Sequence, residues 1–267
     1  MEFTKMHGIG NDYVYVDCFR QPTPKDPKAL AIRVSCPHTG IGSDGLILVE
    51  PCPGADARMR IFNKDGSESE MCGNGIRCVG KLMYDSGLCR KPVLNIMTGG
   101  GMRELELFTE NGTVTGARVD MGKPVIDAQR TALWEDGKRF EFITLSLGNP
   151  HAVTEQHFPE SDAEFYRLGA RFETDPAFPN GANISFIRRE GPGILRARIW
   201  ERGSGPTLAC GSGATAGAIA AFTIGMSGER TVVRLPGGDL TIEYCGDHAY
   251  MSGPATTVFT GTWPEET

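Results

Sequence analysis

Short segments with alternating polar and apolar residues predict strands in both halves of the chain. Residues 58–62 and 196–200 read Arg-Met-Arg-Ile-Phe and Arg-Ala-Arg-Ile-Trp. Further strand candidates cover residues 12–16, 46–49 and 104–107. A period of two is typical of a strand that buries one face, and clusters of Gly, Pro and Asn punctuate the segments. The pattern therefore predicts many short strands joined by turns.

Two segments are predicted to be helices, and each follows a Cys-Gly-x-Gly run. Residues 74–86 carry apolar side chains at helical spacing and stop before Gly87, a residue type common just past a helix end. Residues 212–224 contain no charged residue. Because a helix that is apolar on every side is buried on every side, we expect a curved sheet wrapped around a central helix in each half.

The two halves of the chain resemble each other. An offset of 138 residues aligns four separated segments without a gap: 10–11 with 148–149, 60–62 with 198–200, 72–75 with 210–213, and 99–100 with 237–238. Glycine is frequent, with 35 in 267 residues, but one offset that serves several segments is better explained by duplication than by chance. We expect a mixed α+β fold of two pseudo-symmetric domains, residues 1–116 with 254–267 and residues 117–253, with the active site in the cleft between them.

Length and composition exclude several classes of protein. A chain of 267 residues, 40% hydrophobic and 22% charged, can bury a large core and is not disordered. A net charge of -6 offers no electrostatic footprint for nucleic acid. The first residues contain no long apolar run, so we expect neither a signal peptide nor a membrane anchor, and a cytoplasmic location.

The eight cysteines are too sparse for a disulfide-built scaffold, and we expect reduced thiols. No CxxC pair occurs and no two of the five histidines have a metal-binding spacing, so we expect no metal site. Six cysteines are interpreted as small buried side chains: Cys18, Cys36, Cys52, Cys78, Cys89 and Cys245.

Cys72 and Cys210 differ from these six because they occupy equivalent places before the two predicted helices. Backbone N–H groups and the helix dipole at such a position lower the pKa of a thiol and attract an anion such as a carboxylate. Two thiols on opposite faces of a stereocentre can invert it, because one removes the α-proton while the other delivers a proton. Such a site must also stabilise a carbanionic transition state in a dry cavity.

Polar residues at symmetric or near-symmetric places complete the candidate site. They are Asn11 and Asn149, Asn63 and Glu201, with His151, Asn183 and Arg202 added in the second half. Each also has a structural interpretation, as a turn residue, a strand neighbour, a core histidine or a solvated ion pair. Arg would suit a substrate carboxylate and Glu a substrate ammonium group. Dinucleotide, phosphate-loop and serine-hydrolase motifs are missing or fragmentary, so we expect no nucleotide site.

Four motifs together resemble the diaminopimelate epimerase family, over essentially the whole chain. They are Met6-His7-Gly8-Ile9-Gly10-Asn11-Asp12, Cys72-Gly73-Asn74-Gly75-Ile76-Arg77-Cys78, Gly148-Asn149-Pro150-His151, and the run from Glu201-Arg202-Gly203 to Cys210-Gly211-Ser212-Gly213-Ala214. Proline racemases are less similar, since they typically carry His in place of Asn74 and Thr in place of Ser212.

The resemblance implies interconversion of LL- and meso-2,6-diaminopimelate without PLP or another cofactor, a step toward lysine and peptidoglycan precursors, in a homodimer. It assigns the acid/base pair to Cys72 and Cys210 and auxiliary catalytic positions to His151 and Glu201. The implied substrate contacts are Asn11, Asn63, Gly73, Asn74, Asn149, Asn183, Glu201, Arg202, Gly211 and Ser212. Gly45 stands where some members carry a substrate-contacting Gln, so we expect backbone or a neighbour to compensate.

Two other functions remain open from the sequence. One is another cofactor-independent amino-acid racemase or isomerase of the same fold. The other is a non-catalytic thiol protein that senses oxidation or binds a metal through Cys72 and Cys210. The near-equivalent helix starts leave open which cysteine is the resting thiolate, since the pKa values of an interacting pair belong to the pair.

Overall fold

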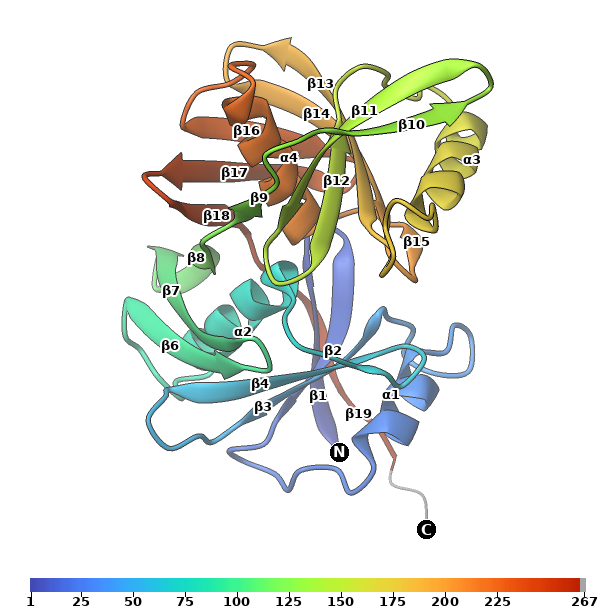
Figure 1. Ribbon diagram of the computed structural model, residues 1–267. Helices are drawn as coiled ribbons and strands as arrows, with labels where there is room; N and C mark the ends of the chain where they lie inside the picture. Colours follow the sequence, from blue (N-terminus) through green and yellow to red (C-terminus); the bar gives the residue numbers. More distant parts are fainter. Residues whose placement is uncertain (265–267) are drawn as a thin grey trace. The chain divides into compact units, whose positions relative to one another are not determined.

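In the computed structural model, which describes residues 1–264, the chain forms two units (Figure 1). Unit 1 comprises Met1–Val119 and the chain from Ser252 onward, and unit 2 comprises Asp120–Met251. The dividing points lie close to the expected ones at 116 and 254, and residues 265–267 of the expected first half lie outside the described residues. Each unit combines short strands with two helices, which confirms the predicted mixed α+β class.

The strands of unit 1 form a mixed sheet in which the first and last strands of the chain are neighbours. They are β1 (Glu2–Gly8), β2 (Asn11–Asp17), β3 (Gly45–Glu50), β4 (Ala57–Asn63), β5 (Glu68–Ser69), β6 (Val93–Thr98), β7 (Gly101–Glu110), β8 (Thr113–Gly122) and β19 (Thr256–Thr262). β1 pairs antiparallel with both β2 and β19, so the end of the chain returns to the first unit. β2 runs parallel to β3, β3 antiparallel to β4, and β4 parallel to β6.

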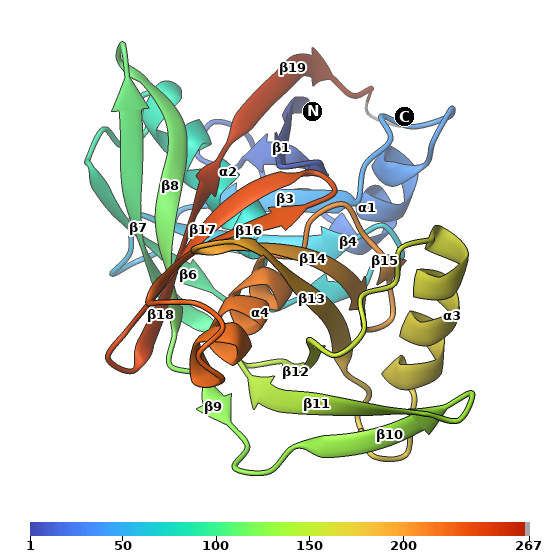
Figure 2. The same cartoon turned by 90° about the horizontal axis from the view of Figure 1, so that it is seen from above.

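Two helices, α1 (Pro27–Ser35) and α2 (Gly73–Asp85), cover opposite faces of this sheet. The side chains that contact the two helices alternate along the strands, because successive side chains of a strand point to opposite faces of the sheet. Val14, Val16, Leu46 and Leu48 form one core with α1. Tyr15 and Ile47, between those positions, reach α2 at Gly75. The curved sheet therefore encloses α2 as the central helix of the unit (Figure 2).

Unit 2 repeats this arrangement. Its strands are β9 (Val125–Ile126), β10 (Thr131–Glu135), β11 (Lys138–Ser146), β12 (Pro150–Thr154), β13 (Asn183–Gly191), β14 (Ile194–Glu201), β15 (Gly205–Pro206), β16 (Arg230–Leu235), β17 (Gly238–Cys245) and β18 (His248–Pro254). β12 runs parallel to β13, β13 antiparallel to β14, β14 parallel to β16, and β16 antiparallel to β17. The same sequence of pairings in unit 1 supports the duplication.

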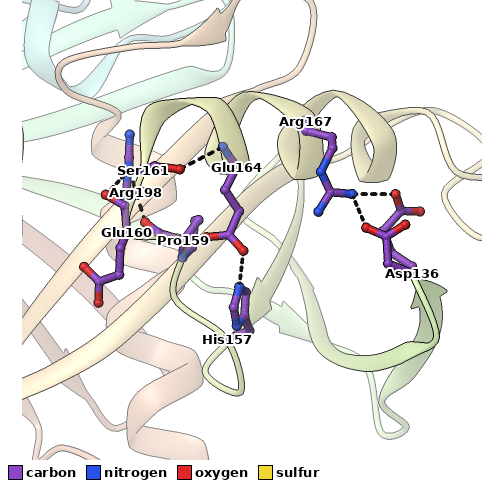
Figure 3. Close-up of polar contacts among 9 residues, drawn as sticks. Asp136, His157, Pro159, Glu160, Ser161, Glu164, Arg167 and Arg198 are labelled. Carbon is purple, nitrogen blue, oxygen red and sulfur yellow. Dashed lines mark hydrogen bonds and ion pairs between the residues drawn. The ribbon is translucent and has the colours of Figure 1, made fainter.

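The helices of unit 2 are α3 (Asp162–Glu173) and α4 (Gly211–Thr223). Every residue of α4 from Gly213 to Ala221 is buried, as its uncharged sequence predicts. Ser161 is the N-cap of α3, and its side chain accepts a hydrogen bond from the Glu164 N–H at 3.2 Å. The Glu164 carboxylate also contacts His157 at 2.8 Å (Figure 3). The buried face of α3, with Phe165 and Phe172, packs on an aromatic core that includes Phe142 and Phe186.

The predicted helices are confirmed with a shift of one residue, since α2 begins at Gly73 and α4 at Gly211. The interpretation of all six remaining cysteines as buried is wrong. Only Cys78 is buried; Cys36 and Cys245 are exposed, because both lie where an element ends, at the C-cap of α1 and the last position of β17. Among residues 1–264, no helix is both long and apolar enough to cross a bilayer.

Candidate active site

Cys72 is the N-cap residue of α2. Its backbone is extended, with φ -137° and ψ 113°, and its Sγ accepts a hydrogen bond from the Gly75 N–H at 3.3 Å. Gly75 fits here because a Cβ at this position would lie 2.7 Å from Ile47. The first N–H groups of the helix, those of Gly73 and Asn74, have no acceptor inside the helix. This end of α2 therefore presents a thiol and backbone donors together, as the sequence predicts.

Asn11 lies beside this thiol. It starts β2 directly after a tight turn in which Ile9 and Gly10 both have positive φ, 48° and 88°. The Cys72 thiol donates to Asn11 Oδ1 at 3.3 Å, and Asn11 Nδ2 donates to the carboxylate of Asp44 at 2.8 Å. The structure thus brings two predicted site residues into contact although they lie 61 positions apart in the sequence.

Two further predicted residues, Asn63 and Asn74, make hydrogen bonds inside unit 1. Asn63 ends β4, and its Nδ2 donates to the hydroxyl groups of Ser67 and Ser69 at 3.0 and 2.9 Å. The side-chain oxygen of Asn74 accepts from Arg77 at 2.9 Å. Asn74 is buried and holds this contact inside the unit.

Arg77 is a fully buried cation in the second turn of α2. Its guanidinium donates to the carbonyls of Gly73 and Pro254, at 3.0 and 3.2 Å, as well as to Asn74. Burial lowers the pKa of Arg77, while its interactions with Cys78, Cys72 and Tyr15 oppose that shift. Arg77 therefore ties the start of α2, next to Cys72, to the returning end of the chain.

Cys210 is the N-cap residue of α4 and repeats the geometry of Cys72. Its Sγ accepts from the Gly213 N–H at 3.4 Å and lies 3.7 Å from the Ser212 hydroxyl. Burial, followed by the nearby Glu201 carboxylate, raises the pKa of Cys210 well above its usual value, although both hydrogen bonds lower it. The expectation of a lowered thiol pKa at this helix start is wrong for Cys210, because burial and a neighbouring negative charge outweigh the helix terminus.

Asn149, at the position equivalent to Asn11, connects His151 to the start of α4. Asn149 Nδ2 lies 3.4 Å from the Ser212 hydroxyl, and Asn149 Oδ1 lies 2.9 Å from His151 Nε2. Burial, with a smaller contribution from Arg202, lowers the pKa of His151 to about 3. His151 is therefore neutral near pH 7, and it reaches Cys210 through Asn149 and Ser212.

Glu201, Asn183 and Arg202 surround the same end of unit 2. Glu201 ends β14 and accepts a hydrogen bond from the Thr207 hydroxyl. Asn183 starts β13, donates to the Pro150 carbonyl at 2.8 Å and accepts from the Arg202 N–H at 3.0 Å. The Arg202 side chain is exposed and donates to the Asn180 carbonyl at 3.0 Å. Asn183 thus fixes two backbone segments, while Glu201 and Arg202 supply the charges.

Comparison with known proteins identifies the family. The diaminopimelate epimerase family model matches residues 3–126 and 143–258. Diaminopimelate epimerases of Acetivibrio thermocellus and Methanococcus maripaludis are 45% and 44% identical to this chain, covering 98% of it and 98% and 99% of their own lengths. This chain belongs to the diaminopimelate epimerase family. The resemblance inferred from the cysteine motifs is therefore confirmed.

Solved structures show how widely the fold of this epimerase family extends. A probable proline racemase of Agrobacterium radiobacter has a TM-score of 0.77 at 16% identity, covering 99% of this chain and 93% of its own. A PhzF-family phenazine biosynthesis protein of Bacillus anthracis has a TM-score of 0.73 at 16% identity, covering 98% of both chains. Likeness at this identity shows the fold alone.

Gly45, where some members of the diaminopimelate epimerase family carry Gln, cannot hold a side chain in this structure. A Cβ there would lie 2.2 Å from the Phe62 carbonyl oxygen, because β3 and β4 pair closely at Gly45 and Asn63. The neighbouring residue Asp44 instead contacts Asn11. This neighbour, rather than a side chain at position 45, supplies the polar group next to Asn11.

Sequence reasoning did not single out three groups of this site: Asp44, Arg77 and Thr207. Arg77 had a detectable signal, since a charged residue near the start of a helix that is expected to be enclosed by a sheet needs buried partners. The signal for Asp44 was weaker: it directly precedes Gly45, which stands where some family members carry Gln. Thr207 had none, because its contact with Glu201 depends on the turn between β14 and β15.

Proposed function

We propose that the protein is a cofactor-independent isomerase that interconverts LL- and meso-2,6-diaminopimelate. The observation that carries this proposal is the pair of cysteines, Cys72 and Cys210, each at the N-cap of a buried, pseudo-equivalent helix in a member of this family. A duplicated thiol with donors around it suits a reaction that handles a proton twice. The substrate is inferred from the name of the related enzymes, the diaminopimelate epimerases.

The proposed mechanism uses one cysteine as thiolate base and the other as thiol acid, with roles exchanged in the reverse direction. Both thiols must reach the same α-carbon, from opposite faces. The N–H groups at the starts of α2 and α4, from Gly73, Asn74, Gly211 and Ser212, would hold the α-carboxylate and stabilise the carbanionic charge. These donors are fixed by the helices, so they need no reorganisation during proton transfer.

The remaining site residues are proposed to recognise and orient the substrate. Glu201 suits an ammonium group and Arg202 a carboxylate, while Asn11, Asn63, Asn149 and Asn183 would contact or frame it. The depressed pKa of His151 makes it a poor proton carrier near neutral pH, so its proposed role is to orient Asn149. A homodimer in the cytoplasm, without a metal or PLP, completes the proposal.

The Cys210 pKa supports a protonated Cys210 at rest, because burial and the Glu201 carboxylate both favour its neutral form. The surroundings of Cys72 differ, because α2 carries the buried Arg77 cation where α4 has Thr215.

A substrate panel tests the proposed function. Purified, reduced, PLP-free protein is incubated with LL-diaminopimelate, L-proline or trans-4-hydroxy-L-proline, and the stereoisomers are separated by chiral chromatography. The proposal predicts formation of meso-diaminopimelate and no inversion of the two cyclic amino acids. Inversion of a cyclic amino acid alone would assign a sibling racemase, and no inversion of any would favour the thiol-sensor alternative.

A further inference from the structure

Asp44 lies in the loop before β3, and its carboxylate is directed at Asn11. Its Oδ2 accepts from Asn11 Nδ2 at 2.8 Å and from the Asp12 N–H at 3.2 Å. Its backbone is held on both sides, because its N–H donates to the Asp12 carbonyl at 2.9 Å and its carbonyl accepts from the Lys64 N–H at 3.0 Å. The carboxylate therefore has a fixed position beside the start of β2.

This contact decides which end of the Asn11 amide faces Cys72. An ionised carboxylate only accepts hydrogen bonds, so Asn11 must turn its NH₂ group toward Asp44. The amide oxygen then points the other way, where it accepts from the Cys72 thiol at 3.3 Å. An acceptor in this place stabilises the protonated thiol, whereas an N–H donor would stabilise the thiolate.

The equivalent asparagine in unit 2 has the opposite orientation. Asn149 Oδ1 faces His151 Nε2, and its Nδ2 faces Ser212. His151 Nδ1 has no hydrogen-bond partner within residues 1–264, and a buried orphan N–H is rarer than an unpaired acceptor, which places the proton of the neutral ring on Nε2. At the place equivalent to Asp44, this unit has Ala182. The duplicated amides are therefore oriented by unlike partners.

We propose that Asp44 is a positioning residue that fixes the Asn11 amide so that its oxygen accepts the proton of Cys72. Asp44 acts through Asn11 and touches neither thiol nor substrate. The inference deepens the proposed function and rests on it for the meaning of Cys72. It predicts that Asp44 controls the protonation of one cysteine of the pair, while the other cysteine is controlled by Glu201 and Ser212.

The test follows the thiol of Cys72 without substrate. Cys72 is alkylated with iodoacetamide over a range of pH, the Cys72 peptide is quantified by mass spectrometry, and the pH midpoint of alkylation is compared between variants. Asp44→Asn keeps the size of the side chain but lets Asn11 turn its N–H toward the thiolate. The midpoint is expected to fall by about one pH unit, a roughly tenfold gain in thiolate, which is the size of one hydrogen bond to a charged group.

Two further variants distinguish an effect of Asp44 that acts through the Asn11 amide from a direct effect of the Asp44 charge. In an Asn11→Ala background, Asp44→Asn is expected to change the thiolate fraction by less than about twofold, since a coupled pair loses its effect when either partner is removed. Asp12→Asn removes a carboxylate that pairs with Lys5 and leaves the Asn11 side chain in place, so it is expected to leave the midpoint unchanged. Tyr15, Arg77 and Cys78, which interact electrostatically with Cys72, stay the same in every variant.

An equal shift in the Asn11→Ala background would overturn the inference, because Asp44 would then act directly through its charge. An unchanged midpoint in Asp44→Asn would overturn it as well. Turnover of LL-diaminopimelate gives the second readout, and kcat is expected to fall about tenfold in Asp44→Asn while the melting temperature is retained. A wild-type protein without epimerase activity would refute the proposed function instead, and the alkylation midpoints would still decide the role of Asp44.

Discussion

Replacing Cys210 by Ser and by Ala separates its two roles, helix cap and proton carrier. The thiol is 5% exposed and accepts the Gly213 N–H at 3.4 Å, so it caps α4. A serine hydroxyl can accept the same N–H and is a preferred N-cap, whereas alanine cannot accept it. A hydroxyl is nevertheless far too weak an acid to exchange protons as a thiol does near neutral pH.

The expected loss of stability follows from the contacts of the sulfur. Because sulfur is a weak acceptor, its cap lies at the low end of the usual range, about 0.5 kcal/mol. Cys210→Ala also leaves a buried space the size of a methyl group, which costs about 1 kcal/mol more. The sum, about 1.5 kcal/mol, lowers the melting temperature by roughly 3–6 °C in a protein of this size, and Cys210→Ser is expected to lose less than about 2 °C.

Thermal unfolding and epimerisation of LL-diaminopimelate are measured on both variants. Loss of one member of an acid–base pair costs about 10²–10⁴ in rate, so both variants are expected to retain under about 1% of the wild-type kcat. A Ser variant with more than about a tenth of the wild-type kcat would remove the thiol from proton transfer. An Ala variant as stable as the Ser variant would refute the capping argument.

Three other substitutions and one control substitution test separate parts of the structure. Gly45→Gln is expected to lower the free energy of unfolding in urea by at least about 1–3 kcal/mol, because its Cβ would meet the Phe62 carbonyl oxygen at 2.2 Å. Gly100→Ala is the control, since its Cβ has only ordinary contacts, and it should cost under about 0.5 kcal/mol. Ser161→Ala removes the N-cap of α3 and is expected to cost about 1 kcal/mol, and an unchanged melting temperature would contradict this. Between pH 6.5 and about 3, His151 is protonated in the unfolded chain but not in the folded one. The free energy of unfolding therefore falls by up to about 1.4 kcal/mol per pH unit on acidification. His151→Gln is expected to reduce that slope, and a variant with the wild-type slope would refute a neutral His151.

The features that the sequence could predict are local or repeated ones. The helix starts at Cys72 and Cys210 follow from a Cys-Gly-x-Gly run before a helical segment, and both cysteines are N-caps. The duplication follows from one constant offset, and it recurs in the pairings of β2 with β3 and of β12 with β13. Such features need no knowledge of what lies across the fold.

The features that could not be predicted depend on contacts between distant segments. Cys210 and Cys72 share the Cys-Gly-x-Gly pattern, but burial and the Glu201 carboxylate raise the pKa of Cys210. The contact of Asp44 with Asn11 joins residues 33 positions apart, and no periodicity reports it. Duplication also misleads here, because it predicts similar surroundings for two asparagines whose amides are oriented by Asp44 and by His151.

The most direct test of the two-thiol account is proton exchange in D₂O. Reduced, PLP-free wild-type protein is incubated with LL-diaminopimelate, and the deuterium at the α-carbon and the stereochemistry are followed together by NMR and chiral chromatography. The account predicts that meso product carries one solvent deuterium at the inverted carbon from the first turnover, because the delivered proton comes from a second, solvent-exchanged thiol. Meso product that retains the original α-hydrogen would contradict it, since a single group would then have removed and returned the same proton.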